Sequence, residues 1–166
     1  VYYSGYIPIS NDHQSLPQIG SAPPLIRENR LYQTDWLMRF YGFQIHEILN
    51  TNSPHLDLQI DPKLSWALNN PQYFPININL ADYWMIIRIP GIGRQSAMKI
   101  IQARKFGQLR EYQVKRMGIA FNRAKYFMIC ADTIAPLGYI DMDKVRHQII
   151  GATKTPLIST PQLSLF

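Results

Sequence analysis

One short run limits the possible folds of this 166-residue chain more than any other: Ile-Pro-Gly-Ile-Gly at positions 89–93. The residues on both sides of it show the apolar spacing of helices, but a proline and two glycines interrupt that pattern. We therefore expect one helix over residues 79–88 and a second over residues 94–105. The two glycines, two positions apart, would allow a tight turn between them.

The start of the second helix is a candidate anion site, because the first N–H groups of a helix have no partner within it. We expect a phosphate oxygen to lie on the N–H groups near Gly91 and Gly93. The side chains of Arg94, Ser96 and Lys99 are placed to reach neighbouring phosphates. The predicted DNA-binding residues are Pro90, Gly91, Ile92, Gly93, Arg94, Gln95, Ser96, Lys99, Arg123 and Lys125. Such contacts predict binding that is independent of base sequence and sensitive to salt.

The charge of the chain is concentrated around this run. Residues 88–125 carry ten Lys and Arg and the single acid Glu111, which gives +9, whereas the whole chain carries +6, so the remainder sums to −3. This concentration favours a phosphate backbone as partner. A merely solvated basic face is the alternative reading.

The string Ile89-Pro90-Gly91-Ile92-Gly93, with Ala97 four residues later, resembles the helix–hairpin–helix family of DNA-binding motifs. The resemblance implies double-stranded DNA as partner, and hairpin carbonyls that can hold a monovalent cation. In the alternative reading, the turn only joins two packed helices or mediates protein contacts.

Residues 106–125 resemble a second, degenerate hairpin of the same family. Ala120 stands at the position of the second glycine, and Met117 at that of the proline. We expect this hairpin to pack against the first, while Arg123 and Lys125 add positive charge.

No catalytic residue is predicted in this chain, so whether it is an enzyme by itself stays open. In the strand-cleaving glycosylases of the family a lysine occupies the position of Gln95, and no aspartate lies between Asp82 and Asp132. The single cysteine, Cys130, excludes a disulfide, a four-cysteine zinc site or a cysteine-ligated iron–sulfur cluster within this chain. The four histidines lack metal-ligand spacing, so we expect no metal site.

The expected fold is mainly α. A smaller mixed α/β or irregular segment (residues 1–75) precedes a tandem helix–hairpin–helix domain (76–135), a terminal helix or packing segment (136–150) and a flexible tail (151–166). Within the first segment we expect a strand over residues 1–8, a helix over 25–43 that Gly42 stops, and a short helix opened by Asp61 and Pro62. In the second we expect an extended stretch at 76–78, Asn79 as a helix cap, and further helices over 109–117 and 122–130.

The chain ends in Gln162-Leu163-Ser164-Leu165-Phe166, which resembles the pentapeptide that attaches bacterial polymerases and repair proteins to the sliding clamp. The resemblance implies that Leu165 and Phe166 enter an apolar pocket of the clamp. In the alternative, the alternating apolar residues form a strand of the chain's own fold.

Residues 23–43, residues 61–68 and the first hairpin together resemble the C-terminal part of bacterial radical SAM proteins assigned to DNA repair or modification. The resemblance implies a parent enzyme whose N-terminal barrel holds a [4Fe–4S] cluster and S-adenosylmethionine; this chain would hold neither. We expect residues 1–8 to be a last strand of that barrel, and the protein to be cytoplasmic, nucleoid-associated and not membrane-bound.

Two alternatives to the DNA-binding module follow from the same sequence. In one, residues 1–75 complete a substrate pocket of the parent enzyme and the hairpin is only structural; Tyr2, Tyr3, Arg27, Arg30 and Asp35 would then matter most. In the other, the chain is a clamp-tethered adaptor without DNA contact.

Overall fold

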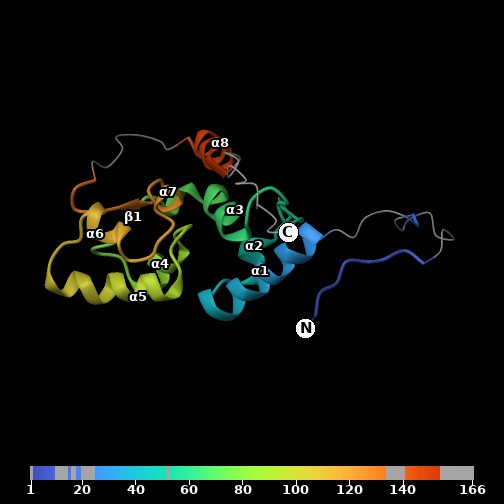
Figure 1. Ribbon diagram of the computed structural model, residues 1–166, viewed down its shortest axis with the longest axis horizontal. Helices are drawn as coiled ribbons and strands as arrows, with labels where there is room; N and C mark the ends of the chain where they lie inside the picture. Colours follow the sequence, from blue (N-terminus) through green and yellow to red (C-terminus); the bar gives the residue numbers. More distant parts are fainter. Residues whose placement is uncertain are drawn as a thin grey trace, which may run out of the picture. The chain divides into compact units, whose positions relative to one another are not determined.

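The computed structural model describes residues 2–9, 15, 18–19, 25–51, 53–133 and 141–153 (Figure 1). The chain divides into two compact units, Val1–Asn69 and Asn70–Phe166. The structure is mainly helical, and the described residues contain one two-stranded parallel sheet. The division falls after Asn69, six residues before the boundary that the sequence indicates.

The first unit consists of helices α1 (Leu25–Tyr41), α2 (Ile45–Ile48) and α3 (Pro62–Asn69), with α3 packed against both others. Gly42 follows α1 with a φ of 69°, which confirms it as the residue that stops the helix. Asp61 caps α3, because its carboxylate accepts the Leu64 N–H at 3.0 Å. The side chains that form the core include Leu37, Phe43, Leu64, Trp66 and Ala67.

The prediction of a strand over residues 1–8 is wrong for the part that the structure describes. Residues 2–9 are not in a strand, and side chains of α1 bind the backbone of Tyr3 and Gly5. The Tyr32 hydroxyl accepts the Tyr3 N–H at 3.0 Å and donates to the Tyr3 carbonyl at 3.1 Å, while the Glu28 carboxylate accepts the Gly5 N–H at 2.9 Å. Residues with a high strand propensity form a strand only when a partner strand is present, and here the segment contacts α1 instead.

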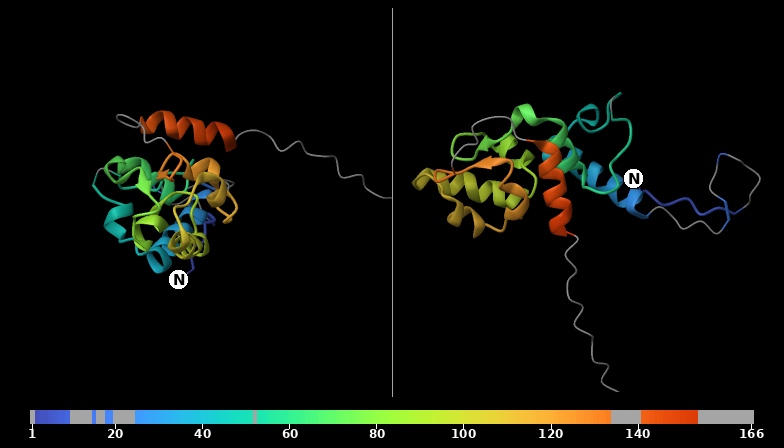
Figure 2. Two further views of the ribbon diagram at one scale, coloured as in Figure 1. Left: turned by 90° about the vertical axis from the view of Figure 1, so that its left-hand side faces the viewer. Right: turned by 90° about the horizontal axis from the view of Figure 1, so that it is seen from above.

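The second unit contains four short helices between two strands. In chain order its elements are η1 (Pro71–Tyr73), β1 (Ile76–Asn77), α4 (Tyr83–Arg88), α5 (Arg94–Ala103), η2 (Arg104–Phe106), α6 (Glu111–Lys115), α7 (Phe121–Ala124), β2 (Met128–Ile129) and α8 (Met142–Thr153). Figure 2 shows α8 as one uninterrupted helix. The helix predicted over residues 109–117 is confirmed in its central part.

The two strands pair in parallel, so that Ile76 lies opposite Met128 and Asn77 opposite Ile129. The Ile76 N–H donates to the Phe127 carbonyl at 2.9 Å, and the Ile78 N–H to the Ile129 carbonyl at 3.1 Å. The extended stretch at 76–78 is thereby confirmed in β1. The helix predicted over residues 122–130 ends at Ala124 instead, because the chain after it supplies acceptors to β1.

Asn79 does not cap α4, contrary to the sequence prediction. The cap is Asp82, whose carboxylate accepts the Met85 N–H at 2.8 Å. The Asn79 side chain instead binds the backbone of Leu109 twice: its oxygen accepts the Leu109 N–H at 2.7 Å, and its nitrogen donates to the Leu109 carbonyl at 3.1 Å. Asn79 therefore fastens the chain before α4 to the chain before α6.

Candidate nucleic-acid interface

The first hairpin, which we define as α4, residues 89–93 and α5, turns where the sequence predicts (Figure 1). Gly91 has a φ of +88°, in the region that favours glycine, whereas Gly93 has a φ of −92° and is the N-cap of α5. The Ile92 N–H donates to the Ile89 carbonyl at 3.1 Å, and the Ala97 N–H to the Gly93 carbonyl at 2.9 Å. The backbone angles therefore require a glycine at position 91 but not at position 93.

Buried apolar side chains hold the turn in place. α4 packs against α5, and five apolar side chains around the turn are buried, namely Ile86, Ile89, Ile92, Ala97 and Ile100, whereas Ile101 is half-buried. Pro90 is fully buried as well. Pro90 and Ile92, which we predicted at the DNA interface, thus act through the shape of the turn and do not offer side chains to a ligand.

The second hairpin, which we define as α6, residues 116–120 and α7, shares two features with the first but differs at its N-cap, where ψ is 74° at Ala120 and 173° at Gly93. Gly118 has a φ of +78°, as Gly91 has in the first hairpin. The Ala124 N–H donates to the Ala120 carbonyl at 3.0 Å, as the Ala97 N–H does to Gly93. Ala120 therefore occupies the place of the second glycine, as the sequence indicates.

The two hairpins are locked together through Gly91. Its carbonyl accepts the Ala120 N–H at 2.9 Å. A Cβ placed on Gly91 would lie 2.7 Å from the Ala120 carbonyl oxygen, closer than real Cβ contacts. The expectation that the second hairpin packs against the first is confirmed, and Gly91 is the residue that permits the close approach.

Ser96 takes part in this lock and is not a phosphate ligand, contrary to our prediction. Its side chain is buried, and its hydroxyl lies 3.2 Å from the Met117 carbonyl oxygen and 3.1 Å from that of Gly118. The hydroxyl of Ser96 therefore faces the second hairpin, and the carbonyls of Met117 and Gly118 share it as their donor.

Two amide donors of the first hairpin keep no acceptor within the described part of the chain. The N–H groups of Gly91 and Gly93 donate to no other described residue. Both glycines are half-buried, and no side chain caps the start of α5. In the second hairpin the amide that corresponds to Gly93, that of Ala120, is already used. An anion placed at the start of α5 would therefore meet N–H donors of the first hairpin that have no acceptor among the described residues.

Charged and polar side chains next to these amides are exposed, namely Arg94, Gln95 and Lys99 on α5. On the second hairpin Arg123 is half-buried, and exposed Lys125 lies 4.9 Å from the centroid of the Tyr126 ring. These five are the predicted binding side chains that the structure leaves at least partly accessible to solvent.

Arg104 shows that not every cation of the basic stretch is available. Its guanidinium donates to the carbonyls of Ile78 and Ala81, the former at 3.0 Å. This link fixes the end of α5 to the chain between β1 and α4. Sequence reasoning counted Arg104 as surface charge, since nothing in the sequence marks the carbonyls that it binds.

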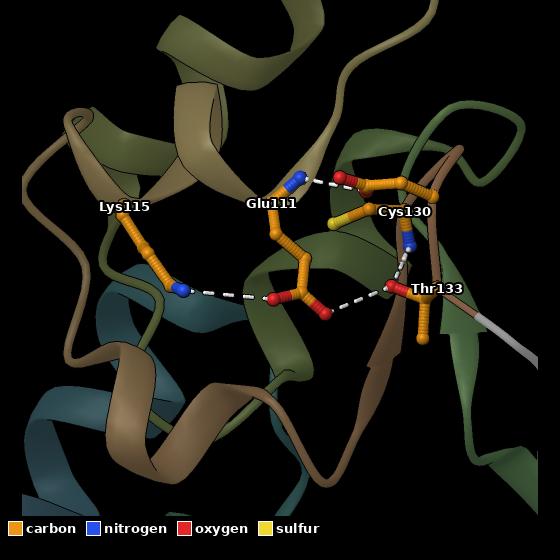
Figure 3. Close-up of polar contacts among 5 residues, drawn as sticks. Glu111, Lys115, Cys130 and Thr133 are labelled. Carbon is orange, nitrogen blue, oxygen red and sulfur yellow. Dashed lines mark hydrogen bonds and ion pairs between the residues drawn. The ribbon is translucent and has the colours of Figure 1, made fainter.

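Glu111, the one acid of the basic stretch, belongs to a polar cluster with four neighbours (Figure 3). Its N–H donates to the Asp132 carboxylate at 2.8 Å, and its carboxylate lies 3.6 Å from the Lys115 ammonium. Thr133 donates to Glu111 at 3.3 Å and accepts the Cys130 N–H at 3.1 Å. The acid therefore holds the unit together and is partly neutralised.

Cys130 joins this cluster through its N–H and is buried, and burial raises the pKa of its thiol to about 11. A thiol with a raised pKa is a poor nucleophile at neutral pH. Among the described residues no three His, Cys, Asp or Glu side chains gather as a metal site. Nor does any helix in the described part of the chain combine the length and hydropathy needed to cross a bilayer.

The predicted clamp-binding residues, Gln162, Leu163, Ser164, Leu165 and Phe166, lie outside the described residues. Comparison of the chain with known protein families, with curated proteins and with solved structures gives no match.

Proposed function

We propose that this chain is a DNA-binding module that grips the sugar–phosphate backbone of duplex DNA without reading its bases. The observation that carries the proposal is the pair of amide donors at Gly91 and Gly93, at the start of a ten-residue helix and beside Arg94 and Lys99. Amides and helix dipole favour an anion at that point, and the two cations add charge that salt screens.

The binding step follows from this arrangement. A phosphate oxygen accepts the Gly93 N–H, which is reachable because no Cβ stands beside it. Arg94 and Lys99 then neutralise neighbouring phosphates. Since every nucleotide offers the same phosphate, the grip carries no base preference.

The module would place a separate catalytic domain, of the radical SAM class suggested by the sequence, on the DNA. Residues 162–166 would add attachment to a bacterial sliding clamp. Deletion of these five residues tests the attachment: a pull-down with the clamp should lose the truncated chain and retain the full one, whereas DNA affinity should not change.

Fluorescence anisotropy tests the DNA grip directly. We expect two short duplexes of unrelated sequence to bind with equal affinity, and log K to fall linearly with log salt at about 0.9 per phosphate contacted. The absence of binding at low salt, or a preference for one duplex, contradicts the proposal.

One observation favours a second candidate, in which the first unit completes the substrate pocket of a parent enzyme and the hairpins are structural. Lys63 on α3 is buried, with its ammonium 4.9 Å from the centroid of the Tyr41 ring. Burial lowers the pKa of Lys63 to about 7, although Asp61 opposes this shift. A lysine with such a pKa can serve as a base or nucleophile near neutral pH.

Two of the pocket residues that the sequence suggests, Arg30 and Asp35, already have partners within the first unit. Arg30 donates to Gln33 and to the Leu58 carbonyl, and Asp35 pairs with Arg39 at 3.0 Å. This second candidate predicts that duplex DNA fails to bind, that added chain raises the turnover of the separately produced catalytic domain, and that Lys63→Met abolishes the increase.

A further inference from the structure

The turn that follows α5 presents an aromatic ring to solvent. Phe106 is 93% exposed, whereas the other described phenylalanines of the second unit, Phe74, Phe121 and Phe127, are buried or half-buried. A single exposed apolar residue is ordinary on a protein surface. Phe106 differs from such a residue in two ways: hydrogen bonds fix the segment that carries it, and its sequence neighbours are cations.

Hydrogen bonds hold both ends of the turn. On one side Arg104 donates to the carbonyls of Ile78 and Ala81, and its own carbonyl accepts the Gly107 N–H at 3.3 Å. On the other side Leu109 is bound twice by Asn79. The ring is therefore carried on a fixed segment, so that little conformational entropy is lost when a ligand covers it.

The sequence next to the ring is positively charged. Lys105 precedes Phe106 and Arg110 follows it, both are exposed, and the sequence has no acid between Asp82 and Glu111. An exposed aromatic ring next to cations matches the chemistry of an unstacked nucleobase with its phosphate, which contributes by stacking on the ring and by charge.

We propose that Phe106 stacks on an unpaired base, so that the module prefers DNA in which a single strand continues from the duplex. This inference rests on the proposed function. The first hairpin grips the duplex at the start of α5, and Phe106 follows the same helix at about 20 Å, the length of some thirteen helical residues. That distance spans about six nucleotides of a strand.

The experiment compares a blunt duplex with the same duplex carrying a single-stranded thymidine extension at the 5′ or the 3′ end. We expect one extended duplex to bind about five- to a hundredfold more tightly than the blunt one. Phe106→Ala should remove this difference and leave the blunt-duplex affinity unchanged, and Phe106→Trp should keep it. In an extension that carries 2-aminopurine, quenching on binding should disappear in Phe106→Ala.

The matched control is Tyr112→Ala, since Tyr112 is an aromatic residue of α6 that is 59% exposed. This variant should keep the preference. Equal affinity of the wild-type chain for all duplexes overturns the inference, and so does a preference that persists in Phe106→Ala; the exposed ring would then belong to a protein partner. Failure of the wild-type chain to bind any duplex instead refutes the proposed function.

Discussion

Each of the two hairpins of the second unit turns at a glycine with positive φ, yet they use their amides differently. In the first, the N-cap of α5 is Gly93, whose N–H donates to no described residue; in the second, Ala120 stands there and donates to Gly91. The backbone angles of Gly93 do not require glycine, but its lack of a side chain would let a ligand approach the amide. At the corresponding position of the second hairpin, the amide of Ala120 binds the first hairpin, so an alanine suffices there. The comparison separates a hairpin whose N-cap amide has no described acceptor from one whose N-cap amide binds the neighbouring hairpin.

The sharpest test of this comparison is alanine substitution of the glycine with positive φ in each hairpin, Gly91 and Gly118. In Gly91→Ala the new Cβ would lie 2.7 Å from the Ala120 carbonyl oxygen, whereas Gly118→Ala would place its Cβ in open space. We expect Gly91→Ala to lower the free energy of unfolding by about 3 kcal/mol or more, and Gly118→Ala by about 1 kcal/mol, the cost of the backbone angle alone. Urea denaturation measures both, and equal losses would contradict the lock between the hairpins.

Removal of the Ser96 hydroxyl leaves two carbonyls of the second hairpin without this donor. We expect Ser96→Ala to lower the free energy of unfolding by about 2 kcal/mol, the cost of an unsatisfied buried group. Affinity for duplex DNA, measured below the unfolding transition, should stay unchanged. If Ser96→Ala were as stable as the wild-type chain but bound DNA more weakly, Ser96 would instead be a DNA-binding residue.

Gly93 offers a test of binding with little effect on folding. Because its φ of −92° suits any residue, Gly93→Val should fold, but the side chain should hinder a phosphate at the amide. We expect about a tenfold loss of duplex affinity by anisotropy, with the circular dichroism spectrum unchanged. Ala120→Gly, at the corresponding position of the second hairpin, is the control and should bind DNA as the wild-type chain does.

The smallest expected effect separates the cations of the two hairpins. Lys99→Ala should weaken duplex binding about threefold to fivefold and reduce the salt slope by about 0.9, as loss of one phosphate contact does. Lys125→Ala, which removes an exposed lysine near a ring of its own chain, should change both less. Identical salt slopes for the two variants would assign equal roles to the hairpins.

The sequence predicts the helices and the turn around Pro90 because these depend on local signals. A proline between helical segments, and aspartate before a helix at Asp61, act within a few residues. The end of α6 near Gly118 is predictable as well, since a glycine after a helical segment is a local signal.

The remaining features depend on partners distant in the chain. The β1–β2 pairing, the attachment of Asn79 to Leu109 and the inward hydroxyl of Ser96 each join residues more than twenty positions apart. No local pattern distinguishes a serine that faces a phosphate from one that faces a carbonyl. Nor does the sequence distinguish Phe106, which is exposed, from Phe74 and Phe127, which are buried.

The parallel ladder between β1 and β2 determines how the module responds to mechanical load. In a parallel pair the chain enters the first strand at one end of the ladder and leaves the second strand at the opposite end. If this region were pulled between attachments on either side, the force would act along the strands and strain the Ile76–Phe127 and Ile78–Ile129 bonds at the same time. Tension would therefore shear the ladder first, and the helices between the strands would be shielded from the pull.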